Sequence, residues 1–173
     1  MVKAYLLISS HFIVFLKSMA KNLFTSDPEN LLGNWKIKRS IIDYAGNQTG
    51  SFKGFAIISR TKVITFDSES NPGYGLFFLE KGTLKFGNAE FKSYREYKIF
   101  LNSDGGKIYF NDSKFFFSFS FVYKKQKVKY LCNSDKYNGS FRILKNLGFK
   151  IKWNVIGPKK NYYSNSIYIK EIN

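Results

Sequence analysis

The stretch WKIKRSI, from Trp35 to Ile41, alternates between two kinds of side chain. Trp35, Ile37 and Ile41 share one parity with Arg39, while the intervening positions carry Lys or Ser. Because successive side chains of a β-strand point to opposite faces, this alternation predicts a strand with one buried face.

Similar short runs continue along the chain without a convincing internal helix. They are Ser51–Ser59, Lys62–Phe66, Gly75–Glu80, Gly82–Phe86, Glu90–Leu101, Lys107–Asn111, Lys114–Tyr123, Lys127–Cys132, Lys136–Leu144, Phe149–Ile156 and Tyr163–Glu171. The segments between them, such as Asn71-Pro72-Gly73, are rich in residues that tolerate turn conformations. This succession predicts an all-β fold, a single antiparallel meander.

Closure into a barrel is favoured over a sandwich, because a long meander otherwise exposes two unpaired edges. We expect a calycin- or lipocalin-like barrel of about 8–10 strands, whose interior either holds one small ligand or is packed with aromatic side chains. The barrel domain is predicted to cover residues 31–173, after a leader at residues 1–30.

The leader has features of a signal peptide. Lys3 precedes an apolar run from Ala4 to Leu16, and Ser18 and Ala20 have the spacing of a cleavage site. The run is shorter than the roughly 20 residues of a membrane span. Lys17 follows it directly, and Met19 could be the true start. A cytoplasmic protein is therefore favoured, and secretion stays open.

The composition is strongly basic but poor in arginine. The chain of 173 residues has a formal net charge of +16, yet only four of its 28 cations are Arg. Nucleic-acid recognition favours the planar Arg fork. The Lys residues are spread along the whole chain, so a solvated basic surface is expected, with binding of nucleic acid or an anionic membrane as the alternative.

Cys132 and His11 are the only cysteine and histidine of the chain. An internal disulfide is therefore excluded, and the usual zinc sites and the Ser-His-Asp and Cys-His catalytic groups cannot be assembled. No metal or cofactor is predicted, and a binding protein is favoured over an enzyme.

Two charged residues occupy strand positions that are expected to face the same side as the apolar residues of their strands. Glu80 is in register with Phe78, and Arg95 with Tyr97 and Ile99. Charges that face the interior must be paired or bind something charged. Glu80 and Arg95 could form an ion pair, or Arg95 could hold a carboxylate or phosphate of a ligand while Tyr97 donates a hydrogen bond.

Two further clusters are expected at a barrel rim. One surrounds Cys132, and the other follows Trp153 through a Gly-Pro turn with two lysines that are either solvated or form an anion gate. The predicted ligand-binding residues are Trp35, Glu80, Arg95, Tyr97, Asp135, Tyr137, Trp153, Lys159, Lys160 and Tyr162.

Several of these motifs, in this order, resemble the bacterial and fungal domain of unknown function numbered 6314. The motifs are Leu32-Gly33-Asn34-Trp35, Thr49-Gly50-Ser51-Phe52-Lys53-Gly54, Glu80-Lys81-Gly82, Arg95-Glu96-Tyr97, Phe110-Asn111-Asp112, Cys132 with Asp135 and Tyr137, and Trp153 to Tyr162. The resemblance implies a calycin-like barrel from about Leu31 to Ile172 and no established activity. The family usually has histidine where this chain has Phe117 and Tyr130, so acid–base or metal chemistry at those positions would be lost here.

The function expected is therefore a small-molecule binding barrel. Its ligand would be apolar or amphipathic and could carry a negative charge. Arg95, Tyr97 and Glu80 would be its polar anchors. The alternatives are an enzyme that uses Glu80 or Asp135 as a general acid or base, and a basic-surface protein that binds nucleic acid or membranes.

Overall fold

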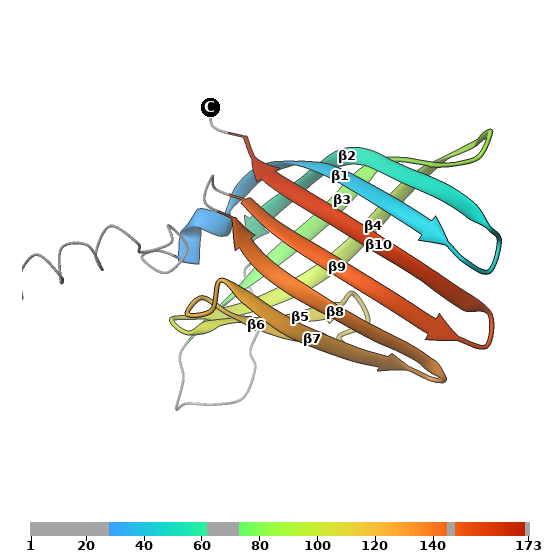
Figure 1. Cartoon of the computed structure of the whole chain (residues 1–173). Helices are drawn as coiled ribbons and strands as arrows, with labels where there is room; N and C mark the ends of the chain where they lie inside the picture. The colour runs from blue at the N-terminus through green and yellow to red at the C-terminus, as the bar shows by residue number, and fades with distance from the viewer. Residues whose placement is uncertain (1–27, 62–72, 145–147, 172–173) are drawn as a thin grey trace, which may run out of the picture.

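A computed structural model describes residues 28–61, 73–144 and 148–171 of the chain. Within them, one antiparallel sheet of ten strands follows a short 3₁₀ helix (Figure 1). The elements are η1 (Pro28–Leu31), β1 (Gly33–Asp43), β2 (Gln48–Arg60), β3 (Tyr74–Phe86), β4 (Ala89–Asn102), β5 (Gly105–Phe110), β6 (Phe115–Ser120), β7 (Lys125–Cys132), β8 (Asp135–Leu144), β9 (Gly148–Gly157) and β10 (Lys160–Lys170).

Pairing of the first strand with the last rolls this sheet up. β1 runs antiparallel to both β2 and β10, from the Trp35↔Lys170 pair to the Asp43↔Tyr162 pair. The order of strands is therefore β6-β5-β4-β3-β2-β1-β10-β9-β8-β7. The sheet curls into a nearly closed barrel, which confirms the predicted all-β meander (Figure 1).

A side chain bridges the seam between the two edge strands, β6 and β7. The backbone N–H of Ser120 donates to Oε1 of Gln126 at 2.8 Å, and Nε2 of Gln126 donates back to the Ser120 carbonyl at 2.6 Å. The carboxamide thus makes the reciprocal pair of hydrogen bonds that a neighbouring strand would make.

Most strand boundaries differ from the prediction by one to three residues, and two predicted runs differ more. The runs predicted at Gly75–Glu80 and Gly82–Phe86 are one continuous strand, β3, because Gly82 lies opposite Gly54 in the ladder with β2. A Cβ atom on Gly54 would lie 2.1 Å from the Lys81 carbonyl oxygen, so glycine allows a close approach of the two strands rather than a break. The run predicted at Lys114–Tyr123 shortens to β6. The run at Lys62–Phe66 and nearly all of the predicted leader lie outside the described residues.

Aromatic side chains close the end of the barrel beside η1. Trp35 is completely buried, and its indole N–H donates to the carbonyl of Leu31 at 3.0 Å. Its ring lies 5.0 Å from that of Phe149, which in turn stacks on Tyr168 with 4.3 Å between centroids. The helix η1 and this aromatic cluster therefore form the floor of the barrel.

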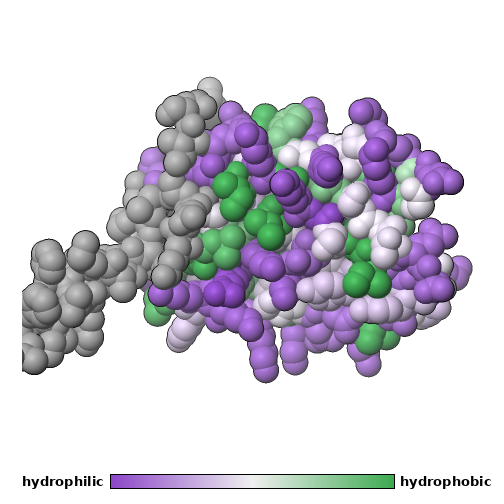
Figure 2. Space-filling model, turned by 45° about the horizontal axis from the view of Figure 1, so that its top comes forward, coloured by the Kyte–Doolittle hydropathy of each residue, from purple (hydrophilic) through white to green (hydrophobic). Residues whose placement is uncertain are grey.

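The outward-facing positions are mainly polar. Figure 2 shows one such face, where hydrophilic side chains predominate and apolar ones form separate clusters. No helix among the described residues has the length and apolar character needed to cross a bilayer.

The floor predicts that Trp35→Ala will strongly destabilise the barrel. Truncating a fully buried tryptophan leaves a cavity and removes the contact with Leu31, which costs about 3–5 kcal/mol. Urea denaturation followed by circular dichroism measures this loss. Lys36→Ala, at the neighbouring exposed position, is the matched control, and equal midpoints for the two variants would contradict the proposed floor.

Candidate functional site

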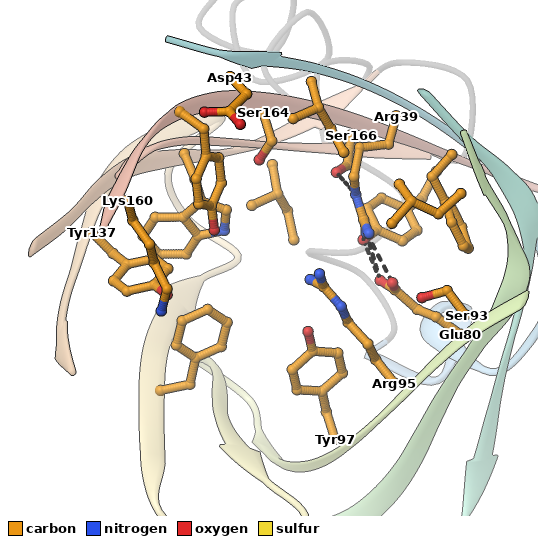
Figure 3. A pocket seen from close by; sticks show the side chains of 18 of the residues that line it. Arg39, Asp43, Glu80, Ser93, Arg95, Tyr97, Tyr137, Lys160, Ser164 and Ser166 are labelled. Atoms are coloured by element: carbon orange, nitrogen blue, oxygen red, sulfur yellow. Dashed lines mark hydrogen bonds and ion pairs between the residues drawn. The ribbon is translucent and has the colours of Figure 1, made fainter. Parts of the chain in front are cut away.

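A cavity of about 390 Å³ occupies the barrel interior above the aromatic floor (Figure 3). Every strand except β7 contributes to its wall. The volume lies near the lower end of the range of about 300–1,000 Å³ that is common for small-molecule sites. Its wall residues are Arg39, Ile41, Asp43, Ala45, Phe52, Phe78, Glu80, Leu84, Phe86, Ser93, Arg95, Tyr97, Ile108, Phe116, Phe117, Tyr137, Ile151, Trp153, Lys159, Lys160, Tyr162, Ser164, Ser166 and Tyr168.

A buried ion pair joins Arg39 of β1 to Glu80 of β3. Nη2 of Arg39 donates to the two carboxylate oxygens of Glu80 at 3.1 and 2.9 Å. Ser166 accepts from Nε of Arg39 at 2.6 Å, and Tyr168 donates its hydroxyl to Glu80. The side chains of Arg39 and Glu80 are only 9% and 2% exposed. The pair is therefore desolvated and hydrogen-bonded on several sides, as a buried pair must be.

The surroundings keep the groups beside Glu80 in one protonation state. Burial alone would lower the pKa of the Arg39 guanidinium, but the neighbouring Tyr168 and Glu80 raise it above its ordinary value. Burial, followed by the negative charge of Glu80, raises the pKa of the Tyr168 hydroxyl. Arg39 therefore stays charged and Tyr168 stays a hydrogen-bond donor.

Arg95 is the second guanidinium of the cavity, and the predicted Glu80–Arg95 ion pair is wrong. The two residues are direct partners in the β3–β4 register, but the carboxylate is taken by Arg39, which reaches across β2. Arg95 instead projects into the lumen, where it is accessible to water although the barrel wall surrounds it (Figure 3). Within the described part of the chain, no acidic side chain forms an ion pair with Arg95.

Electrostatic surroundings keep Arg95 charged. Enclosure by the wall lowers the pKa of Arg95, whereas Tyr97 raises it. The like charge of Arg39 then lowers the pKa and Glu80 raises it, and the net effect is a value above the ordinary one. The lumen therefore contains a permanent cation without a carboxylate partner.

Aromatic rings form another part of the cavity wall. The rings of Tyr97 and Phe116 are stacked at 6.1 Å, and those of Phe116 and Trp153 at 5.2 Å. Burial, then the charge of Glu80, raises the pKa of Tyr97, so its hydroxyl remains a donor. The cavity thus combines one polar wall with one aromatic wall.

Lys160 lies at the mouth of the cavity and is held by two neighbours. Its ammonium group is 2.6 Å from Oδ2 of Asp135 and donates to the Tyr137 hydroxyl at 3.3 Å. The hydrogen bond to Asp135 raises the pKa of Lys160. Burial, with Tyr137 nearby, raises the pKa of Tyr162 to about 12. Lys159 also lines the mouth and is exposed.

Eight of the ten predicted residues line this one cavity, and two do not. Trp35 belongs to the floor, and Asp135 lies outside the lining as the partner of Lys160. The prediction missed Arg39, Ser166 and Tyr168, although each shares a strand parity with buried residues. That shared parity was the signal that could have identified them.

The remaining polar chemistry is limited. Phe117 lines the cavity and Tyr130 packs on Phe116 at 5.0 Å, so neither position supplies an imidazole. Cys132 is a partly buried free thiol. Among the described residues, no three His, Cys, Asp or Glu side chains gather in a way that could hold a metal ion.

Comparison with known proteins gives a family and a fold. A family model described as "Family of unknown function (DUF6314)" matches residues 31–170. No curated protein matches the chain. The structure is similar to that of the S-type phycobiliprotein lyase CPES from Guillardia theta, with a TM-score of 0.59 and 12% identity over 84% of this chain and 90% of that one. At this identity the similarity shows a shared fold only.

The buried pair predicts that Glu80→Gln will destabilise the protein by about 3 kcal/mol, because Arg39 is left as a buried charge without a counter-ion. The double variant Arg39→Met/Glu80→Gln removes that charge and is expected to recover part of the loss. Urea denaturation measures both. Glu90→Gln, which removes an exposed ion pair with Lys85, is the control and should leave stability unchanged. A double variant no more stable than Glu80→Gln would argue against the unpaired charge as the cause.

The raised pKa of Tyr162 predicts a loss of stability at alkaline pH. The unfolded chain releases this proton near the ordinary value of 10.0, before the folded protein does so at about 12. The contribution of Tyr162 to the free energy of unfolding is therefore fully present below pH 10 and is lost as the pH rises toward 12. Between these limits, the unfolding free energy of the wild type should fall more steeply than that of Tyr162→Phe. Parallel curves would show that Tyr162 does not contribute.

Proposed function

Because the chain belongs to DUF6314, a family of unknown function, its activity must be inferred from the site, and we propose that the barrel binds a small amphipathic anion in its lumen. The ligand is a carboxylate or phosphate attached to a compact apolar body. Arg95 binds the acidic group, and the aromatic wall accepts the apolar part.

Arg95 is the observation that carries this proposal. The guanidinium of Arg95 is accessible to water, but the surrounding barrel wall screens its charge less well than open solvent would, which strengthens its attraction for an anion in the lumen. Its closest candidate for a carboxylate partner, Glu80, is occupied by Arg39. An anionic ligand that enters the cavity would form a charge-assisted and bidentate contact, the strongest type of hydrogen bonding available to Arg.

The rest of the wall supports an apolar ligand body. The stacked rings of Phe116 and Trp153 line the cavity, and Phe78 and Ile108 add further apolar side chains to its wall. A volume of about 390 Å³ suits one or two fused rings or a short acyl chain. The Tyr97 hydroxyl is placed beside Arg95 to donate a second hydrogen bond (Figure 3).

Catalysis by a carboxylate receives less support. Glu80 accepts hydrogen bonds from Arg39 and Tyr168, and Asp135 is paired with Lys160 outside the cavity lining. A general base needs a free lone pair within reach of its substrate. The Glu80 carboxylate is engaged by three hydrogen bonds, and Asp135 does not line the cavity, so neither is well placed for this role.

A pair of fluorescent probes tests the proposed role of Arg95. The first is 1-anilinonaphthalene-8-sulfonate, an amphipathic anion, and the second is N-phenyl-1-naphthylamine, which has the same rings without the sulfonate. For Arg95→Gln we expect the affinity for the anionic probe to fall about tenfold or more, since a charged hydrogen bond is lost, while affinity for the neutral probe is retained. Fluorescence titration gives both dissociation constants.

The matched control is Arg142→Gln, which removes an exposed arginine from the outer face of β8 and should leave both affinities unchanged. Unchanged binding of the anionic probe by Arg95→Gln would refute the proposed anchor. Native mass spectrometry of the purified protein complements the titration, because a co-purified anion should be present in the wild type and absent from Arg95→Gln.

A further inference from the structure

The outer face of β7, β8 and β9 carries a dense group of cations, here called the basic wall: Lys125, Lys127, Lys129, Arg142, Lys150 and Lys152. The register places Lys125 opposite Arg142, and Arg142 opposite Lys150. Ser140 is the only residue between Lys127 and Lys152 in the next row.

Almost nothing neutralises the basic wall. The only acidic residue in these three strands is Asp135, which is paired with Lys160 at the mouth. Consistent with crowding of like charges, partial burial and then the charges of Lys152 and Arg142 lower the pKa of Lys150. Such a surface attracts anions over a distance of about 10 Å at moderate salt.

Large aliphatic side chains adjoin the basic wall where it reaches the mouth. Leu131 is 64% exposed and Ile156 is 51% exposed. The register places Lys136 directly between them, opposite both. Ile42 and Tyr44 continue this exposed apolar rim on β1 and its turn, where Tyr44 donates its backbone N–H to the carbonyl of Asn161. Exposed apolar side chains grouped at one place mark an interaction surface.

We infer that the mouth of the barrel docks on an anionic lipid bilayer, with Leu131 and Ile156 entering the interfacial layer, Lys136 between them at the lipid headgroups and the basic wall behind them attracting the anionic surface. Interfacial binding requires this combination of inserted apolar area and attraction to anionic lipids. The basic wall begins with Lys129, one row behind Leu131, and ends with the row of Lys125, Arg142 and Lys150 at the floor end, so in this orientation its charge acts on the membrane mainly at a distance.

A bilayer fits this surface better than a nucleic acid does. Single-stranded nucleic acid is bound by basic grooves with aromatic rings that stack on the bases. The outward positions of β7, β8 and β9 hold no aromatic residue, and the basic wall includes one Arg among its six cations. Leu131 and Ile156 can insert between acyl chains but cannot stack on bases.

Docking in this orientation turns the cavity opening toward the lipid. Lys159 and Lys160 lie at that opening, close to Lys136 of the rim. An amphipathic anion could then pass between membrane and lumen without crossing bulk water. This consequence rests on the proposed function, whereas docking itself does not.

Co-sedimentation of the full chain with vesicles tests the docking surface. We expect binding to vesicles of phosphatidylcholine mixed with phosphatidylglycerol, weak binding to phosphatidylcholine alone, and a steep loss of binding with added salt. Leu131→Ser/Ile156→Ser should lower the affinity about tenfold through lost apolar insertion. Lys127→Glu/Lys129→Glu/Lys152→Glu should lower it more than about tenfold.

Two matched controls locate the effect. Ile57→Ser/Val122→Ser removes exposed apolar side chains away from the mouth, and Lys38→Glu/Lys53→Glu/Lys92→Glu makes the same change in net charge on the opposite side of the barrel. Both should bind vesicles as the wild type does. Circular dichroism verifies that every variant is folded.

Three results would overturn the inference. They are a wild type that does not bind the mixed vesicles, control variants that lose as much affinity as the test variants, and binding of a single-stranded oligonucleotide in place of vesicles. The proposed ligand binding in the lumen and the proposed membrane docking are tested independently. Arg95→Gln should still bind vesicles, and Leu131→Ser/Ile156→Ser should still bind 1-anilinonaphthalene-8-sulfonate.

Discussion

The guanidinium of Arg39 reaches from β1 past β2 to both carboxylate oxygens of Glu80 on β3, and Ser166 and Tyr168 of β10 complete its hydrogen bonds. These contacts connect strands on both sides of the β1–β10 pairing that rolls the sheet into a barrel. A buried ion pair requires this full set of partners, because each unpaired polar atom would carry a desolvation cost. The polar wall of the lumen is therefore tied to the geometry of closure.

The same ion pair leaves Arg95 without a carboxylate partner. Arg39 takes the Glu80 carboxylate, and no ion pair joins Arg95 to an acidic residue in the described part of the chain. Arg39 is structural, and Arg95 faces the cavity beside Tyr97 and the stacked rings of Phe116 and Trp153. A cation beside an aromatic wall suits the proposed amphipathic anion, since the charge would fix the orientation of the ligand and the rings would supply contact area.

Near the mouth of the barrel, the two faces of the same strands have different roles. Inward residues of β8 and β9, such as Tyr137 and Trp153, line the cavity, while outward residues of the same strands carry the basic wall and Ile156. Because side chains alternate along a strand, one short segment serves both surfaces. The cavity opening and the proposed lipid-docking rim are thus adjacent as a consequence of strand geometry.

The sequence by itself determined the strands, the meander and the inward parity of Glu80 and Arg95, because alternation is a local property of an extended backbone. It also predicted the rim clusters that contain Tyr137, Lys160 and Tyr162. Only the tertiary structure decided which cation pairs with Glu80. Glu80 faces Arg95 across the ladder, but a long side chain from a strand two positions away reaches the carboxylate instead. Closure likewise placed Trp35 in the floor rather than in the lining of the cavity. Partner choice in a lumen depends on distances between side-chain ends across the barrel, and no local pattern contains those distances.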